Sequence, residues 1–219
     1  MSKSFRNVIN SMLNGHAKRG VGVQVRANTP TILCEIGCNN YPMFVGQNHI
    51  LNAVAEFNEL NHTHGLSADL LEQIPEKMGN PIFVFDSLTR PDSICMMLDL
   101  YDDMNQPIVV SIHLNGFEKI NGEKVDVNYI TSIYGKHHTG VLALMHRAID
   151  NDKLLYVNKK EYLKVVKKLG LHFPMKKLNG CPDCTVKESR NVINATVDRH
   201  HYNSFYESKH YASFEERYN

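Results

Sequence analysis

The segment 128–136, Asn-Tyr-Ile-Thr-Ser-Ile-Tyr-Gly-Lys, contains the residues whose types and spacing best suit chemistry. Asn128, Ser132 and Tyr134 have the same parity, so in a regular strand they would project from one face. Lys136 follows where Gly135 is expected to end the strand. Hydrogen-bonding groups beside a cation could hold a phosphodiester and offset the charge that grows on phosphorus during phosphoryl transfer. The solvated face of an edge strand would show the same pattern.

A second candidate is the histidine cluster Asn-His-Thr-His-Gly at 61–65. Metal-free cleavage of RNA needs a group that removes the 2′-hydroxyl proton and a group that protonates the leaving 5′ oxygen, and imidazole can do both near neutral pH. We expect His64 in a connection between two helices, where its ring could be accessible. It could instead act as a cap, because a cation is favourable near a helix C-terminus. His137 and His138 form another candidate pair, or a plain surface pair.

Four cysteines form two pairs that could bind metal, Cys34 with Cys38 and Cys181 with Cys184. Four thiolates could hold a tetrahedral zinc ion if the pairs meet in the fold. The second pair could instead bind zinc with histidines of the tail. Those histidines are His200, His201 and His210. Unliganded thiols are the default in a cytosolic chain, and metal-free cleavage would require no cofactor, so zinc stays one alternative.

Net charge gives no general case for nucleic-acid binding, because 24 Lys and Arg nearly balance 23 Asp and Glu. A local excess of basic residues lies between residues 158 and 190. Within it, one side of an expected helix carries lysines that could attract an RNA backbone. They are Lys160, Lys164, Lys167 and Lys168. A solvated helix face would explain them as well.

The elements that must position these residues follow from hydrophobic periodicity and from capping residues. Alternation and turn residues predict strands at 21–25, 81–85, 93–101, 107–114, 125–134 and 154–157. Helical spacing predicts helices at 30–36, 47–60, 68–74, 139–149 and 158–169, with Thr29, Ser67 and Asn158 as N-caps and Pro75 ending the third. The order favours an α+β fold, in which an N-terminal helical layer packs on a four- to five-stranded, mainly antiparallel sheet followed by a C-terminal helix and an irregular tail.

We expect three segments: a loosely held lead-in over 1–21, an α+β domain over 22–170 and a tail rich in cysteine and aromatic residues over 171–219. The N-terminal residues lack the apolar core of a signal peptide, and no apolar run approaches the roughly 20 residues of a membrane span. The sequence therefore predicts a cytoplasmic protein without a membrane partner. It contains no phosphate-binding loop, nucleophile elbow or zinc-protease helix.

Over roughly residues 22–170 the chain resembles the phage MuF C-terminal domain family. The stretches that carry the resemblance, in order, are Thr29-Pro30, His64-Gly65-Leu66-Ser67, Asn80 to Ser87, Asn128 to Lys136 and Leu154 to Lys159. This resemblance implies a relationship to the α+β nucleases barnase, EndoU and RelE. It implies a phage- or prophage-encoded, metal-independent endoribonuclease, a toxin or host-takeover protein that cleaves RNA through a 2′,3′-cyclic phosphate in the host bacterial cell.

Carried over to this sequence, the resemblance implies six catalytic-site residues. They are His64, Ser87, Asn128, Ser132, Tyr134 and Lys136. His64 would transfer the proton, Lys136 would stabilise the phosphorane, Asn128, Ser132 and Tyr134 would position the phosphate, and Ser87 would support them. The alternative is a non-catalytic phage inhibitor that uses a nuclease-like scaffold to bind a host defence ribonucleoprotein of the CRISPR type or an RNA-processing protein. A zinc-stabilised nucleic-acid binder is the third interpretation.

Overall fold

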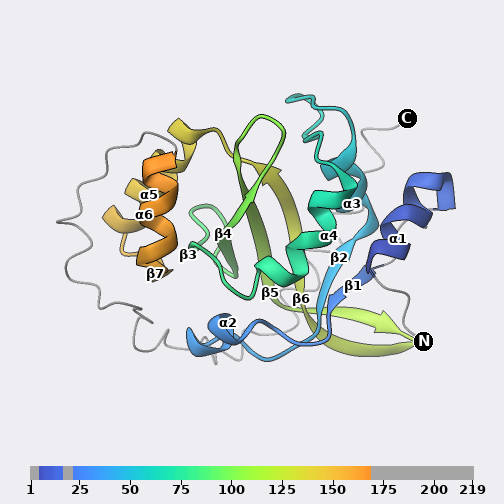
Figure 1. Ribbon diagram of the computed structural model, residues 1–219. Coiled ribbons are helices and arrows are strands. Elements are labelled where there is room, and N and C mark those ends of the chain that lie inside the picture. The colour runs from blue at the N-terminus through green and yellow to red at the C-terminus, as the bar shows by residue number, and fades with distance from the viewer. Residues whose placement is uncertain (1–4, 17–21, 169–219) are drawn as a thin grey trace. The chain divides into compact units, whose positions relative to one another are not determined.

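The computed structural model of the chain describes residues 5–16 and 22–168, which lie in one compact unit (Figure 1). Its strands are β1 (Gly22–Arg26), β2 (Met43–Gly46), β3 (Phe83–Asp86), β4 (Ser93–Tyr101), β5 (Pro107–Ile120), β6 (Glu123–Gly135) and β7 (Leu154–Val157). Its helices are α1 (Phe5–Ser11), the π-helical turn η1 (Met12–His16), α2 (Thr31–Glu35), α3 (Gln47–Val54), α4 (Ala68–Lys77), α5 (His138–Asp150) and α6 (Lys159–Lys168). None of these described helices is long and apolar enough to span a bilayer.

The predicted α+β class is confirmed, but the expected sheet of four to five strands is too small. The described residues form a seven-stranded mixed sheet in the order β1-β2-β6-β5-β4-β3-β7. All neighbours are antiparallel except β2 and β6, which run parallel with Met43 opposite Asn128. Strand β2 escaped the sequence analysis because Met43, Phe44 and Val45 are all buried, so it shows no alternation between apolar and polar residues.

The hairpin of β5 and β6 is the longest pair in the sheet and extends well beyond the predicted strands. Asn121 and Gly122 connect the two strands with positive φ angles of 53° and 86°. Two consecutive left-handed residues match the right-handed twist of a hairpin, and Asn-Gly is the pair that tolerates them best. This hairpin carries the segment 128–136 into the middle of the sheet.

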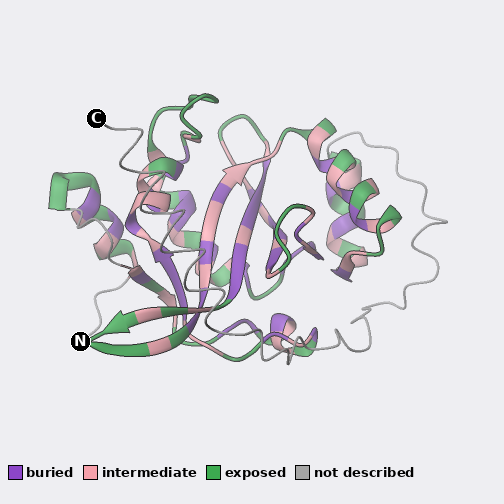
Figure 2. Ribbon diagram, turned by 180° about the vertical axis from the view of Figure 1, so that it is seen from behind, coloured by how far each residue is buried: buried purple, intermediate pink, exposed green. Residues whose placement is uncertain are grey.

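Helices cover the two faces of the sheet unequally. On one face, α1, α3 and α4 pack on the strands and enclose a first core, which includes Ile9, Ile50, Leu71, Ile112 and Ile130. On the other face, α5 and α6 cover the end of the sheet near β3 and β7 and enclose a second core, which includes Phe83, Val109, Val141 and Tyr162. In Figure 2 the middle of this second face, at β5 and β6, is seen without a described helix in front of it.

Several predicted helix boundaries are confirmed and others are corrected. Ser67 caps α4 through a 3.2 Å hydrogen bond from the Leu70 N–H, and the Asn158 side chain accepts from the Glu161 N–H at the start of α6. Thr29 does not cap α2, because its hydroxyl bonds to the backbone carbonyls of Asn39 and Tyr41 instead.

Other differences lie at helix ends. Helix α4 continues past the proline that was expected to end it, and the Pro75 carbonyl accepts a hydrogen bond from the Arg26 guanidinium. Helix α3 ends at Val54 instead of residue 60, which leaves a long loop before α4. Helix α1 lies in the stretch expected to be a loose lead-in, and its Ile9 is fully buried in the first core.

Candidate functional site

A β-bulge in β6 decides which side chains of segment 128–136 share a face. Ser111 of β5 pairs with Ser132, whereas the next residue, Ile112, pairs with Ile130, so Thr131 is the extra residue. The alternation of side chains is shifted at this point. Ile130 and Ile133 therefore both pack in the first core, and Tyr134 packs against the second.

The bulge corrects the prediction that Asn128 lies beside Ser132 and Tyr134. Asn128 faces the first core and is completely buried. Its amide nitrogen donates to the Thr29 hydroxyl at 2.9 Å and to the Asn39 carbonyl at 3.0 Å, and its amide oxygen accepts from the Asn115 N–H at 3.1 Å. These bonds join the loop around α2 to the β5–β6 hairpin, so Asn128 is a structural residue.

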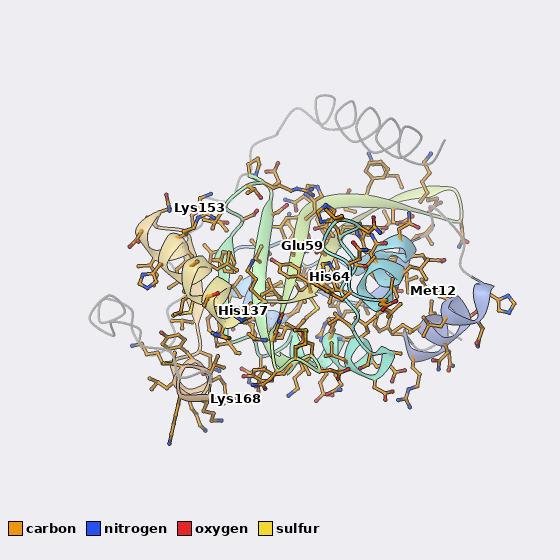
Figure 3. All side chains as sticks on the ribbon, turned by 90° about the horizontal axis from the view of Figure 1, so that it is seen from above. Met12, Glu59, His64, His137, Lys153 and Lys168 are labelled. Carbon is orange, nitrogen blue, oxygen red and sulfur yellow. The ribbon has the colours of Figure 1, made fainter. Side chains whose placement is uncertain are left out.

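His64 lies in the loop between α3 and α4 and is held there by the backbone. Its N–H donates to the Asn52 carbonyl at 3.0 Å, and the N–H groups of Gly65 and Leu66 donate to the carbonyls of Ala55 and Ala53 at 2.8 and 2.7 Å. These bonds attach the loop to the end of α3. The imidazole ring lies against the ring of Tyr134, with 5.6 Å between the ring centroids, and Figure 3 shows His64 close to Glu59 of the same loop.

Lys136 approaches the same tyrosine from the end of β6. Its ammonium lies 5.8 Å from the centroid of the Tyr134 ring, and its N–H bonds to the Pro107 carbonyl at 2.9 Å. Its aliphatic stem passes over Gly140 in α5, where a Cβ atom would come within 2.6 Å of the lysine Cε. His64 and Lys136 therefore both lie against Tyr134, although the two residues are far apart in the sequence.

Burial sets the protonation states of this group. Burial lowers the pKa of His64 below its usual value, and the nearby His62 lowers it further. The imidazole is therefore neutral at physiological pH and has a nitrogen that can accept a proton. Burial also raises the pKa of Tyr134 to about 12, with a smaller contribution from Cys95. The phenol therefore stays protonated and can donate a hydrogen bond.

The sequence analysis missed polar residues that β5 and β6 place on the same side of the sheet as Tyr134. Ser111 pairs with Ser132, and its hydroxyl lies 3.5 Å from the Cys95 thiol. Further along, His113 lies opposite Tyr129, whose hydroxyl donates to the Glu118 carboxylate. We call the half-exposed members of this set, Ser111, Tyr129, Ser132 and Tyr134, the open face. Polar residues at 111 and 113 within the otherwise apolar stretch 107–114 were the signal that could have revealed it.

Other predicted site residues lie apart from this group. The Ser87 hydroxyl accepts from the N–H groups of Thr89 and Arg90 in the turn after β3, so it supports that turn. The α6 lysines at 160, 164, 167 and 168 are all exposed. Lys164 pairs with Glu161 at 2.8 Å, and the Lys168 ammonium lies 3.1 Å from the centroid of the Tyr101 ring.

Two of the four predicted zinc ligands, Cys34 and Cys38, lie among the described residues. Cys34 lies half-buried in α2, Cys38 is buried just after it, and neither forms a disulfide within the part of the chain that the structure describes. Burial raises the pKa of the Cys34 thiol, and Glu35 raises it further, which disfavours the thiolate that a metal needs. Cys181 and Cys184, and the tail histidines at 200, 201 and 210, lie outside the described residues. Within residues 5–16 and 22–168, no three His, Cys, Asp or Glu side chains cluster as a metal site would.

A family model matches part of the chain. No curated protein and no solved structure matches the chain. The model of the family described as Phage MuF-C-terminal domain matches residues 57–164. This range begins in the loop that carries His64 and ends in α6, and it includes β3 to β7. The segment that contains His64, Tyr134 and Lys136 is thus similar to the phage MuF-C-terminal domain.

Proposed function

We propose that this domain is a metal-independent endoribonuclease that cleaves RNA at the open face. The observation that carries the proposal is the convergence of a neutral imidazole and a lysine ammonium on the ring of Tyr134. The imidazole centroid lies 5.6 Å and the ammonium 5.8 Å from the centroid of that ring. A phosphodiester placed between them would meet a proton acceptor on one side and a positive charge on the other.

In the proposed reaction, His64 accepts the proton of the 2′-hydroxyl group while the 2′ oxygen forms a bond to phosphorus. The bond between phosphorus and the 5′ oxygen breaks, and that oxygen leaves with a proton taken from water at this half-exposed site. The products are a 2′,3′-cyclic phosphate and a 5′-hydroxyl, and His64 returns its proton to solvent. Lys136 offsets the charge on the phosphorane, and Ser132 and Tyr134 donate hydrogen bonds to its non-bridging oxygens.

Access and charge support this assignment. Ser111, Ser132 and Tyr134 are partly buried. On their side of the sheet α5 packs on the second core, which includes Val109 of β5 and borders Tyr134, and Figure 2 shows no described helix in front of the rest of β5 and β6. Helix α6 flanks the second core on the same side. Its exposed lysines would add a long-range attraction for the RNA backbone, which weakens as salt is added. Asn128 and Ser87 take no part in the proposed reaction.

The proposal is tested by incubating the purified protein with total RNA in EDTA and analysing the new ends. Wild-type protein should yield 2′,3′-cyclic phosphates, and His64→Ala should lose about 10²- to 10⁴-fold in rate, the usual contribution of a proton-transfer group. His62→Asn is the matched control, because it removes a neighbouring exposed imidazole and asparagine tolerates the φ of 55° at that position. This control should retain most of the activity.

Two results would contradict the proposal. Intact RNA under all these conditions would leave binding of a host defence or RNA-processing protein as the function of the scaffold. Equal rates for wild type and His64→Ala would attribute the cleavage to other residues.

A further inference from the structure

The loop that carries His64 also forms an open pocket. Its volume is about 460 Å³, and all of its lining residues come from this one loop. They are Ala55, Glu56, Phe57, Asn58, Asn61 and Thr63. The last lining residue, Thr63, directly precedes His64 in the sequence. No step of the proposed reaction uses the pocket.

The walls of this pocket are fixed by hydrogen bonds within the loop. The N–H groups of Asn58 and Thr63 donate to each other's carbonyls at 3.2 and 3.1 Å. The Thr63 hydroxyl donates to the Glu56 carbonyl at 2.5 Å, and the Asn61 N–H donates to the Asn58 side-chain oxygen at 3.1 Å. A loop that is ordered in this way loses little conformational entropy when a ligand binds.

Phe57 is one of the residues that line the pocket, and its side chain is not packed in a core. It is 65% exposed, and its backbone and Cβ lie close to Gly65, where a Cβ atom would meet the Phe57 nitrogen at 3.3 Å. The positive φ of 64° at Gly65 and this close approach both favour glycine there. The backbone and Cβ of Phe57 thus pack against the residue that follows His64 in the same loop.

The chemistry of the lining suits a nucleobase. A base has an aromatic face that can stack on a phenylalanine ring and an edge that carries both donors and acceptors. The side-chain amides of Asn58 and Asn61 offer both kinds of group, and Glu56 and Thr63 add further polar groups at the wall.

We propose that the pocket at Phe57 is a nucleobase subsite, which binds one base of the RNA next to the phosphate held between His64 and Lys136. The base stacks on Phe57, and the amides of Asn58 and Asn61 contact its edge. Binding there would fix the position of the adjacent phosphodiester and give the nuclease a sequence preference. This inference rests on the proposed function, which supplies the phosphate position.

The test measures binding without cleavage. Fluorescent pentanucleotides of adenine, cytosine or uracil carry 2′-O-methyl groups, so the 2′ oxygen cannot attack, and an abasic backbone of the same length serves as reference. Wild-type protein should bind at least one base series more tightly than the abasic backbone. Phe57→Ala should weaken that binding by about 5- to 150-fold, which corresponds to the loss of one base–aromatic stack.

Two variants provide the controls. Phe57→Tyr keeps the aromatic ring and should retain the binding of wild-type protein. Leu60→Ala removes a side chain that is 90% exposed on the same loop but does not line the pocket, so it should leave binding unchanged. Binding of Phe57→Ala that equals wild type, or no preference of wild type for any base over the abasic backbone, would overturn the subsite.

Cleavage is measured separately with 2′-hydroxyl RNA, so the two proposals can fail independently. Base-dependent binding that requires Phe57 but leads to no cleavage would support the subsite and contradict the proposed nuclease activity. Cleavage that requires His64 but is indifferent to Phe57→Ala in rate and sequence preference would keep the nuclease and remove the subsite.

Discussion

The imidazole of His64 lies against the ring of Tyr134 with 5.6 Å between centroids, one residue from a loop after α3 and the other from the end of β6. The contact requires two features of the fold. The bonds from residues 64–66 back to α3 hold the loop near β6, and the bulge at Thr131 turns Tyr134 away from the first core. The consequences of this contact and of its surroundings can be measured.

The first prediction concerns the pH dependence of cleavage. A general base works only when it is neutral, and burial lowers the pKa of His64. The rate should therefore stay high as pH falls through the usual histidine range of about 6.5 and decline only at lower pH. Initial rates on a fluorogenic RNA from about pH 4 to about pH 8 would locate this acidic limb.

The matched variant for this profile is His62→Asn. The charge of His62 is the second cause of the lowered pKa, so its removal should move the acidic limb slightly upward while the plateau rate stays the same. An acidic limb at or above the usual histidine range would assign the proton transfer to another group.

The second prediction concerns Lys136. Lys136→Met removes the charge but keeps most of the apolar stem that passes over Gly140. If the ammonium stabilises the phosphorane, kcat should fall by about 10²- to 10³-fold, as for the loss of one transition-state donor. Lys136→Arg should recover part of the rate.

Lys124→Met is the control for the loss of a positive charge, because Lys124 is an exposed lysine of the β5–β6 hairpin. This variant should keep the kcat of wild-type protein. Steady-state kinetics on the same fluorogenic RNA compare the two substitutions. Equal kcat values for the Lys136→Met and Lys124→Met variants would exclude a catalytic charge at the end of β6.

The third prediction separates Asn128 from the proposed reaction. Asn128→Ala removes three buried hydrogen bonds; the Thr29 hydroxyl and the Asn39 carbonyl keep their bond to each other, but the Asn115 N–H loses the Asn128 acceptor. Urea denaturation should show a free energy of unfolding lower by about 1–3 kcal/mol, the cost of an unsatisfied buried group. At a temperature where the variant is folded, kcat should equal that of wild type. A folded but inactive variant would show that Asn128 takes part in the reaction.

The fourth prediction concerns His113 and stability. Burial lowers the pKa of His113, so the unfolded chain takes up a proton at a higher pH than the folded protein does. The contribution of His113 to the free energy of unfolding is therefore fully present above the usual histidine pKa of about 6.5. It falls as pH drops below that value, by up to about 1.4 kcal/mol per pH unit for one proton.

Replacing His113 by Gln should flatten this dependence. Chemical denaturation of both proteins at a series of pH values provides the measurement, and the difference in slope is independent of any loss of stability at neutral pH. Parallel curves for the two proteins would show that other groups carry the dependence.

The sequence predicted much of the fold where periodicity is strong. Strand β4, the first half of β5 and helix α5 lie close to their expected positions because their alternation or helical spacing is regular. The strand β2 and its parallel partnership with β6 were missed, since parallel pairing joins distant segments and leaves no local signal.

The sequence analysis selected His64, Tyr134 and Lys136 by their side-chain chemistry and by a family resemblance. Both depend on residue types, which the sequence gives without knowledge of the fold. Their meeting at one ring, the exclusion of Asn128 from it and the pocket at Phe57 were decided by tertiary structure alone. The physical reason is that one bulged residue reverses every later side chain of a strand, and nothing in the order Ile-Thr-Ser-Ile shows where pairing with β5 slips.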